Sequence, residues 1–119
     1  LGEAGSLNSL GMVYTILGKY RKAIECHERA LEIARETNNL LTESNTLNNL
    51  GLAYKSVGEY RKAIDCHEKA LKIKSALGNK LSESNALNNL GAVYKRLGEN
   101  QKAIQYHEKA LEISRQIKY

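Results

Sequence analysis

The 119-residue chain contains no proline, no tryptophan and no phenylalanine, and it also lacks long apolar runs. Its core must therefore be built from Leu, Ile, Val, Ala and Tyr. A membrane-spanning helix needs about 20 consecutive apolar residues, and no stretch of this sequence approaches that length. No signal-peptide pattern opens the sequence either. We therefore expect no membrane association.

Cysteine is scarce as well. Cys26 and Cys66 are the only two cysteines, and they form no C-x-x-C pair. A disulfide framework or a zinc motif would need more cysteines at characteristic spacings. We interpret the pair as reduced thiols and expect a cytoplasmic protein.

Repetition is the dominant feature of the sequence. The stretch 47–54, Leu-Asn-Asn-Leu-Gly-Leu-Ala-Tyr, returns with small changes at 7–14 and 87–94. Residues 41–79 and 81–119 are identical at 22 of 39 aligned positions. A fixed period of about 20 to 50 residues is typical of solenoids and other repeat arrays. We therefore expect a single array of three repeats, residues 1–39, 40–79 and 80–119.

The chain has no evident capping repeats. It lacks an initiator methionine, and neither terminal helix shows the polar outer face that a capping repeat needs. We expect a fragment of a longer array, or an engineered piece of one.

Each repeat has the pattern of two helices. In the middle repeat, Leu47, Leu50 and Tyr54 recur at the spacing of one helical face. Asn39 is expected to cap the start of this helix, and Gly58 to end it in a left-handed conformation. The same plan predicts further helices near 3–17, 20–37, 60–77, 80–97 and 100–117. The prediction is an all-α fold, an α-solenoid of three stacked antiparallel helical hairpins.

A glycine lies in the middle of the first helix of each repeat, as Gly51 does in the second. Mid-helix glycine costs about 1 kcal/mol relative to alanine, so a packing reason is needed. A close approach of the second helix would supply one, with the small Ala63 as the expected partner. Gly51→Leu should then destabilise the chain several times more than Gly51→Ala.

The repeats resemble the tetratricopeptide repeat, whose pattern begins W-x-x-L-G-x-x-Y. The middle repeat matches it at Leu47-x-x-Leu50-Gly51-x-x-Tyr54 and again at Ala63. It departs from the pattern by a leucine in place of the tryptophan and by the absence of the closing proline. A histidine replaces the later aromatic residue, and the period is about six residues longer than usual. This longer form is similar to the repeats of Pins-type spindle-orientation adaptors and of kinesin light chains.

The resemblance implies a right-handed superhelix whose first helices line a concave groove for an extended peptide. Asparagines occupy the expected groove-facing positions, although asparagine is unfavourable inside helices. A carboxamide offers two N–H donors and an acceptor oxygen, which suit contacts to a peptide main chain. The alternative is that the amides hydrogen-bond to one another between repeats. The predicted contact residues are Asn8, Asn45, Asn48, Asn49, Asn85, Asn88 and Asn89.

Lys55, Lys95 and Arg96 complete the predicted site, because none has an acidic residue four positions away on its own helix. Their functional interpretation is an acidic partner, and the alternative is that they are ordinary solvated charges. The formal net charge of +5 lies entirely in residues 41–119. We therefore expect the bound peptide to be acidic.

Other classes of function fit less well. The basic residues form no continuous stripe, and Tyr14, Tyr54 and Tyr94 are expected in the core, so we expect no nucleic-acid binding. The three histidines lie one repeat apart, and each repeat adds two helix layers spaced about 8–10 Å. That separation is too large for one metal ion. We predict no cofactor, no metal and no enzyme activity.

Two functions therefore stay open. The first is a protein–protein interaction scaffold that binds an extended, acidic peptide segment in the groove. The second is a structural segment that self-associates end to end through its terminal hairpins. It is motivated by the apolar Leu111, Ile113 and Ile117, which no following repeat covers.

Overall fold

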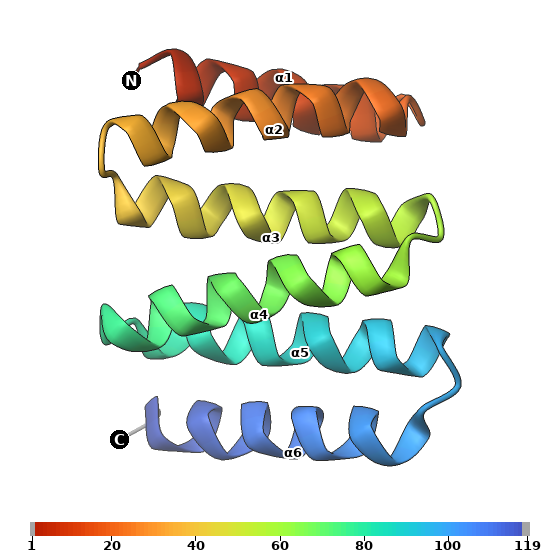
Figure 1. The fold of residues 1–119 in the computed structure, drawn as a ribbon. Coiled ribbons are helices and arrows are strands. Elements are labelled where there is room, and N and C mark those ends of the chain that lie inside the picture. The colour runs from red at the N-terminus through yellow and green to blue at the C-terminus, as the bar shows by residue number, and fades with distance from the viewer. Residues whose placement is uncertain (1, 118–119) are drawn as a thin grey trace.

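In the computed structural model, residues 2–117 are described, and they form six α-helices joined by tight turns (Figure 1). Every helix begins where the sequence pattern predicted and ends within one residue of the predicted end. The all-α prediction is confirmed. The helices are α1 (Glu3–Ile16), α2 (Tyr20–Glu36), α3 (Leu40–Ser56), α4 (Tyr60–Ala76), α5 (Lys80–Arg96) and α6 (Asn100–Ile117).

The turns have the conformation that the glycine positions predicted. Gly18, Gly58 and Gly98 close the three hairpins with φ angles of +76°, +81° and +80°. Between hairpins, Gly78 adopts a φ of +72°, and Asn38 takes the same role one repeat earlier with a φ of 54°. Asparagine is one of the few residues with a Cβ that tolerates this left-handed region.

Asparagine also starts two of the helices. The Oδ1 atoms of Asn39 and Asn79 accept hydrogen bonds from the backbone N–H groups of Thr42 and Ser82, both at 3.1 Å. Each bond satisfies an N–H group that has no partner within the helix. The N-cap of α3 is therefore as predicted, and α5 has the same kind of cap.

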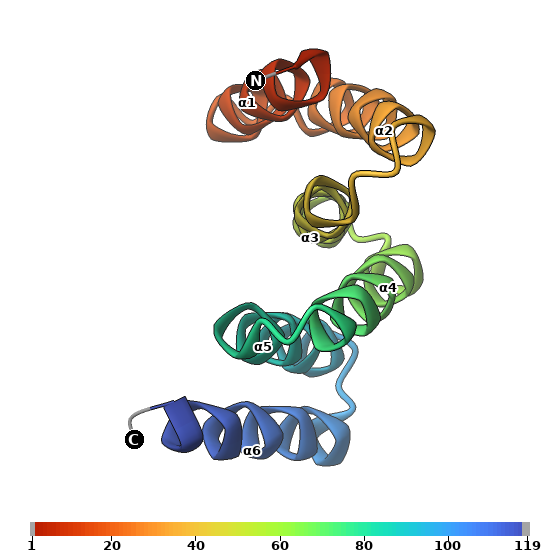
Figure 2. The ribbon, with the colours of Figure 1, turned by 90° about the vertical axis from the view of Figure 1, so that its left-hand side faces the viewer.

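The six helices form two layers (Figure 2). The odd-numbered helices contact their odd-numbered neighbours, whereas among residues 2–117 no even-numbered helix contacts another. An array that is closer-packed on one side curves toward that side. The odd-numbered helices therefore line the inner, concave side of the array.

The core lies between the two layers and is most complete in the middle of the array. Leu47 and Leu90 are 2% and 0% exposed. Val13 is 50% exposed, although the equivalent positions in the next repeats, Ala53 and Val93, are buried. The first hairpin is covered on one side only, as the geometry of a solenoid requires.

Candidate functional site

A histidine of the second helix packs against the mid-helix glycine of the first in every repeat. A Cβ added to Gly11 would lie 2.7 Å from the ring of His27, and one added to Gly91 would lie 2.6 Å from the ring of His107. The same clash occurs between Gly51 and His67. The close approach predicted from the glycines is present, but the assigned partner was wrong. The imidazole ring, not the alanine, needs the space that a Cβ would fill.

The same histidines hold an asparagine of the facing helix. An amide oxygen only accepts hydrogen bonds, so the proton of each imidazole lies on Nδ1, which donates. The asparagines in these pairs are thereby fixed within their own hairpin. The Nδ1–Oδ1 distances are 2.8 Å for His27 and Asn8, 3.0 Å for His67 and Asn48, and 2.8 Å for His107 and Asn88.

His67 is fully buried, and its other ring nitrogen has no hydrogen-bond partner in the described part of the chain. Burial lowers the pKa of His67 to about 4, and the nearby charge of Lys55 acts in the same direction. Burial also lowers the pKa of His27. His67 is therefore neutral at pH 7, which matches its role as a packed hydrogen-bond donor.

On the concave side, asparagines from two neighbouring repeats line one hollow of about 290 Å³. We call it the amide hollow. Its asparagines come from α3 and α5, where residues three and four positions apart share a helix face. The structure thus brings together five of the ten predicted site residues. The lining residues are Asn45, Asn48, Asn49, Lys74, Ser82, Asn85 and Asn89.

Lys74 reaches this hollow from α4, in the outer layer, and sequence reasoning missed it. It is only 2% exposed, and its Nζ donates a hydrogen bond to Oδ1 of Asn45 at 2.6 Å. Burial lowers the pKa of Lys74. The sequence contains a signal that could have found it, because the equivalent positions hold the small residues Ala34 and Ser114.

Asn8 and Asn88 lie outside the amide hollow. Oδ1 of Asn8 accepts from His27, and its Nδ2 donates to Oγ1 of Thr46 at 2.8 Å. Asn8 therefore links the first repeat to the second. The alternative interpretation of the asparagines also expected hydrogen bonds between repeats, but between two amides, whereas the partner of Asn8 is a hydroxyl. Asn88 is exposed and bonded to His107.

The three predicted basic residues also lie away from the hollow. Lys55 is ten residues beyond Asn45 on α3, which corresponds to about 15 Å along the helix. Lys95 and Arg96 occupy the same end of α5. The guanidinium carbon of Arg96 lies 5.7 Å from the ring centroid of Tyr60, where it interacts with the aromatic face. These charges are thus at the opposite end of the groove-lining helices.

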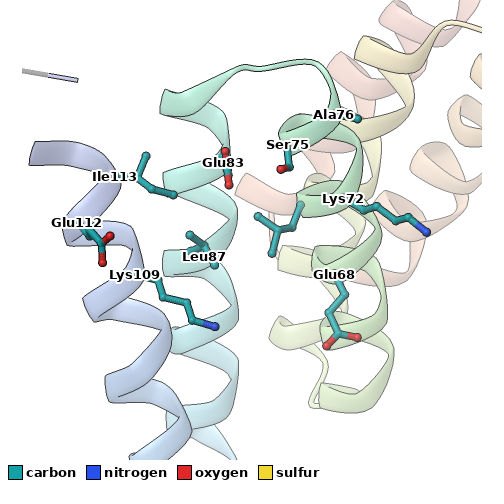
Figure 3. A pocket seen from close by; sticks show the side chains of 10 residues that line it. Glu68, Lys72, Ser75, Ala76, Glu83, Leu87, Lys109, Glu112 and Ile113 are labelled. Atoms are coloured by element: carbon teal, nitrogen blue, oxygen red, sulfur yellow. The ribbon is translucent and has the colours of Figure 1, made fainter. Parts of the chain in front are cut away.

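A larger hollow lies on the other side of the array, where α4, α5 and α6 surround about 630 Å³ (Figure 3). Leu87 of α5 lies between side chains of α4 and α6, with Glu68 and Lys109 at its rim. One repeat earlier, α2, α3 and α4 surround a similar hollow of about 440 Å³. Because even-numbered helices do not touch one another, this gap recurs with the repeat. It is a consequence of the curvature and carries no distinctive set of chemical groups.

The described residues show no other candidate chemistry. No group of three or more His, Cys, Asp or Glu among residues 2–117 is placed to hold a metal ion. Burial raises the pKa of Cys66 to about 11, which makes this thiol unreactive at neutral pH. No helix in the described range has the length and apolarity required to span a bilayer.

Comparisons with known proteins agree with this geometry. The structure is similar to that of BtubC from P. vanneervenii, with a TM-score of 0.91 and 30% sequence identity over 97% of this chain and 48% of BtubC. The chain thus spans about half the length of that protein. It is also similar to MamA, with a TM-score of 0.79 and 29% identity over 98% of this chain and 62% of MamA.

A third similar structure is the TPR domain of Arabidopsis FLU, with a TM-score of 0.87 and 24% identity over 92% of each chain. No curated protein sequence matches the chain significantly. The family model described as tetratricopeptide repeat matches residues 2–76 and 44–116, which together include nearly all of the described helices. With its three helical hairpins and this match, the chain belongs to the tetratricopeptide repeat family.

Proposed function

We propose that this array binds an extended, acidic segment of another protein on its concave side, at the amide hollow. Its family makes the array a protein–protein interaction scaffold. One observation carries the more specific proposal: five asparagines from two repeats line a single hollow on the inner side. They are Asn45, Asn48, Asn49, Asn85 and Asn89.

The amides of the hollow retain unused hydrogen-bonding groups. No side-chain hydrogen bond within residues 2–117 engages Asn49, Asn85 or Asn89. Asn48 uses its oxygen for His67 and keeps its two N–H donors. An extended peptide presents alternating C=O and N–H groups, and such amides can pair with both. The proposal therefore assigns main-chain recognition to these residues and leaves out Asn8, whose oxygen and one of whose N–H groups already make hydrogen bonds.

The acidic character of the ligand follows from charge. The chain carries 18 basic and 13 acidic residues, and the excess lies in the second and third repeats, which form the hollow. Lys55, Lys95 and Arg96 are proposed to attract acidic side chains further along the peptide, and Asn88, about two turns before Lys95 on α5, to contact the peptide between them and the hollow. Such attraction weakens as salt screens it.

The proposal can be tested by panning a displayed library of random peptides on the immobilised array and measuring the enriched peptides by calorimetry. Enriched peptides should be acidic. Asn49→Ala combined with Asn89→Ala should weaken their binding about tenfold, roughly the effect of losing one or two net hydrogen bonds. These two positions are preferable to Asn48 and Asn88, because the latter support histidines of the hairpins.

Urea unfolding of the double variant provides the control, and its midpoint should be no lower than that of the wild type, because alanine favours a helix interior more than asparagine does. Enriched peptides that bind the double variant as tightly as the wild type would exclude the amide hollow as the binding site. A library that yields no enriched peptide would count against peptide binding altogether.

A second candidate function is end-to-end self-association. The observation that favours it is the exposure of apolar side chains on both terminal helices: Val13 and Ile16 of α1 are 50% and 83% exposed, and Leu111 of α6 is 50% exposed. Sedimentation equilibrium between micromolar and millimolar concentration should then show a rising mass. A constant monomer mass would eliminate this function.

The proposal places the array in the cytoplasm. Cys26 and Cys66 are both free thiols, a state that the reducing cytosol maintains. A fluorescent fusion of the full-length parent protein, viewed with compartment markers, would test this location.

A further inference from the structure

Lys74 is an exception to the repeat. The equivalent positions hold Ala34, which is 1% exposed, and Ser114. This position therefore lies inside the array and is normally filled by a small side chain. Neither the fold nor the repeat pattern requires a lysine here, so its presence needs a separate reason.

The ammonium group of Lys74 lacks a countercharge in the described part of the chain. No carboxylate among residues 2–117 lies within 4.0 Å of its Nζ, and in that range its one hydrogen bond is to Asn45. An ammonium has three donors, so two N–H groups are available toward the amide hollow. A buried charge without a partner is strongly unfavourable. A bound anion would remove that penalty.

The neighbouring amides are oriented as donors. The oxygen of Asn45 accepts from Lys74, and the oxygen of Asn48 accepts from His67. Both amides therefore direct their NH₂ groups away from these bonds. Together with the hydroxyl of Ser82, the hollow combines one positive charge with several donors, which is the complement of a carboxylate.

The preceding pair of repeats serves as an internal comparison. A hollow of about 470 Å³ lies at the corresponding place between the first and second repeats. It has Gly5, Ala34 and Thr42 where the amide hollow has Asn45, Lys74 and Ser82. The set of donors is thus specific to one position in the array and is not a general property of the stack.

We propose that the amide hollow is a carboxylate-binding subsite in which Lys74 provides the charge and the NH₂ groups of Asn45 and Asn48 provide further donors. The ligand is the carboxylate of an acidic side chain in a bound peptide, or the carboxylate at the end of that peptide. This inference rests on the proposed function for its ligand. In this inference buried Lys74 binds the carboxylate directly, whereas Lys55, Lys95 and Arg96 supply long-range attraction.

A small probe tests the subsite without any peptide. Sodium acetate is titrated against sodium chloride at equal ionic strength, and the side-chain amide signals of Asn45 and Asn85 are followed by NMR. Four proteins are compared: the wild type, Lys74→Ala, Lys74→Met and Lys72→Ala. Lys72 is the matched control, because it is an exposed lysine on the same helix and lines the opposite hollow.

Acetate should shift these signals in the wild type and in Lys72→Ala but not in the two Lys74 variants. Lys74→Ala should fold, because Ala34 fills the same place in the first repeat, and Lys74→Met retains the length of the side chain. Equal shifts in all four proteins, or no acetate shift beyond that of chloride in the wild type, would overturn the subsite.

Three N-acetylated peptides then distinguish the sources of the carboxylate: acetyl-(Gly-Glu)₄-amide, acetyl-(Gly-Gln)₄-amide, and acetyl-(Gly-Gln)₄ with a free C-terminus. The wild type should bind the first or the third about tenfold more tightly than the second, as expected for one charge-assisted contact. A preference for the first identifies a side chain, and a preference for the third identifies a chain end. Lys74→Ala should remove most of the preference, and the remainder reflects attraction by Lys55, Lys95 and Arg96.

The outcomes separate this inference from the proposed function. If acetate binding depends on Lys74 but no peptide binds, the subsite stands and peptide binding fails. If all three peptides bind the wild type equally, peptide binding stands and the subsite is wrong. A preference for glutamate that is undiminished in Lys74→Ala also overturns the subsite.

Discussion

His67 combines two roles that usually belong to different residues. Its ring fills the space left by Gly51, as an aromatic side chain would, while its Nδ1 donates to Asn48 across the hairpin. A phenylalanine could supply only the first. The neutral imidazole can fill this space and donate this hydrogen bond at once. Protonation would add a buried charge, and it is therefore unfavourable in the folded chain.

The free energy of unfolding should therefore decrease as the pH is lowered from 6.5 to 4. The pKa of His67 falls from an ordinary 6.5 to about 4 on folding, so in this range the unfolded chain binds a proton that the folded chain does not. Stability is complete above 6.5, and the loss ends near pH 4. This shift corresponds to roughly 3 kcal/mol, and His27 contributes in the same direction.

Urea unfolding at pH 7.5, 5.5 and 4 measures this decrease. His67→Phe serves as the control, because it retains a ring but removes the titrating group, and its stability should fall less over the same range. A wild type and a His67→Phe variant with parallel pH profiles would show that other groups cause the decrease.

Gly51→Ala should destabilise the chain, although alanine normally improves a helix interior by about 1 kcal/mol. The added Cβ would overlap the ring of His67, and such overpacking typically costs about 1–3 kcal/mol. The sequence alone predicted that Gly51→Leu would lower the free energy of unfolding several times more than Gly51→Ala. Because alanine already overlaps the ring, we now expect a smaller difference between the two variants. Urea unfolding measures the effect.

A double-mutant cycle identifies the partner of Gly51. In a His67→Ala background the ring is gone, so Gly51→Ala should become neutral or stabilising. A Gly51→Ala variant that is equally destabilised with and without the ring would indicate that another group limits the approach of the two helices.

At the scale of the element, caps determine where the helices start. Asn79 caps α5, the helix that brings Ser82 and Asn85 to the amide hollow. Asn79→Ala should cost about 1 kcal/mol in urea unfolding. Lys19→Ala is the matched control, because Lys19 precedes α2 without a side-chain capping bond. A loss for Lys19→Ala as large as that for Asn79→Ala would contradict the assignment.

At the scale of the whole molecule, stability should be greatest in the middle hairpin. Within residues 2–117, the hairpin of α3 and α4 is the one with another hairpin on each side, whereas the first hairpin leaves Leu10 and Val13 about half exposed. Stability in such an array is a sum of repeat and interface contributions. Amide hydrogen exchange of the 119-residue chain should therefore be slowest in α3 and α4. Uniform protection across the six helices would show that the array unfolds as one unit.

The repeat, the helices, their ends and their caps could be predicted from the sequence of this chain. These features are local: a helical face follows from a spacing of three and four residues, and a glycine or asparagine after a helix fixes its end within the same few residues. The family followed from the same patterns. Five of the predicted site residues also come together, because their spacing of three and four residues places them on one face of α3 and of α5.

Only the tertiary structure decided which amides remain available and which group brings charge to the hollow. Asn48 is 19 residues from the His67 that binds its oxygen, and Asn45 is 29 residues from Lys74. Such pairs depend on how the second helix of a hairpin packs against the first, and no spacing within one helix specifies that packing. For the same reason, the glycine of each repeat indicated a close contact, but only the folded chain showed that a histidine makes it.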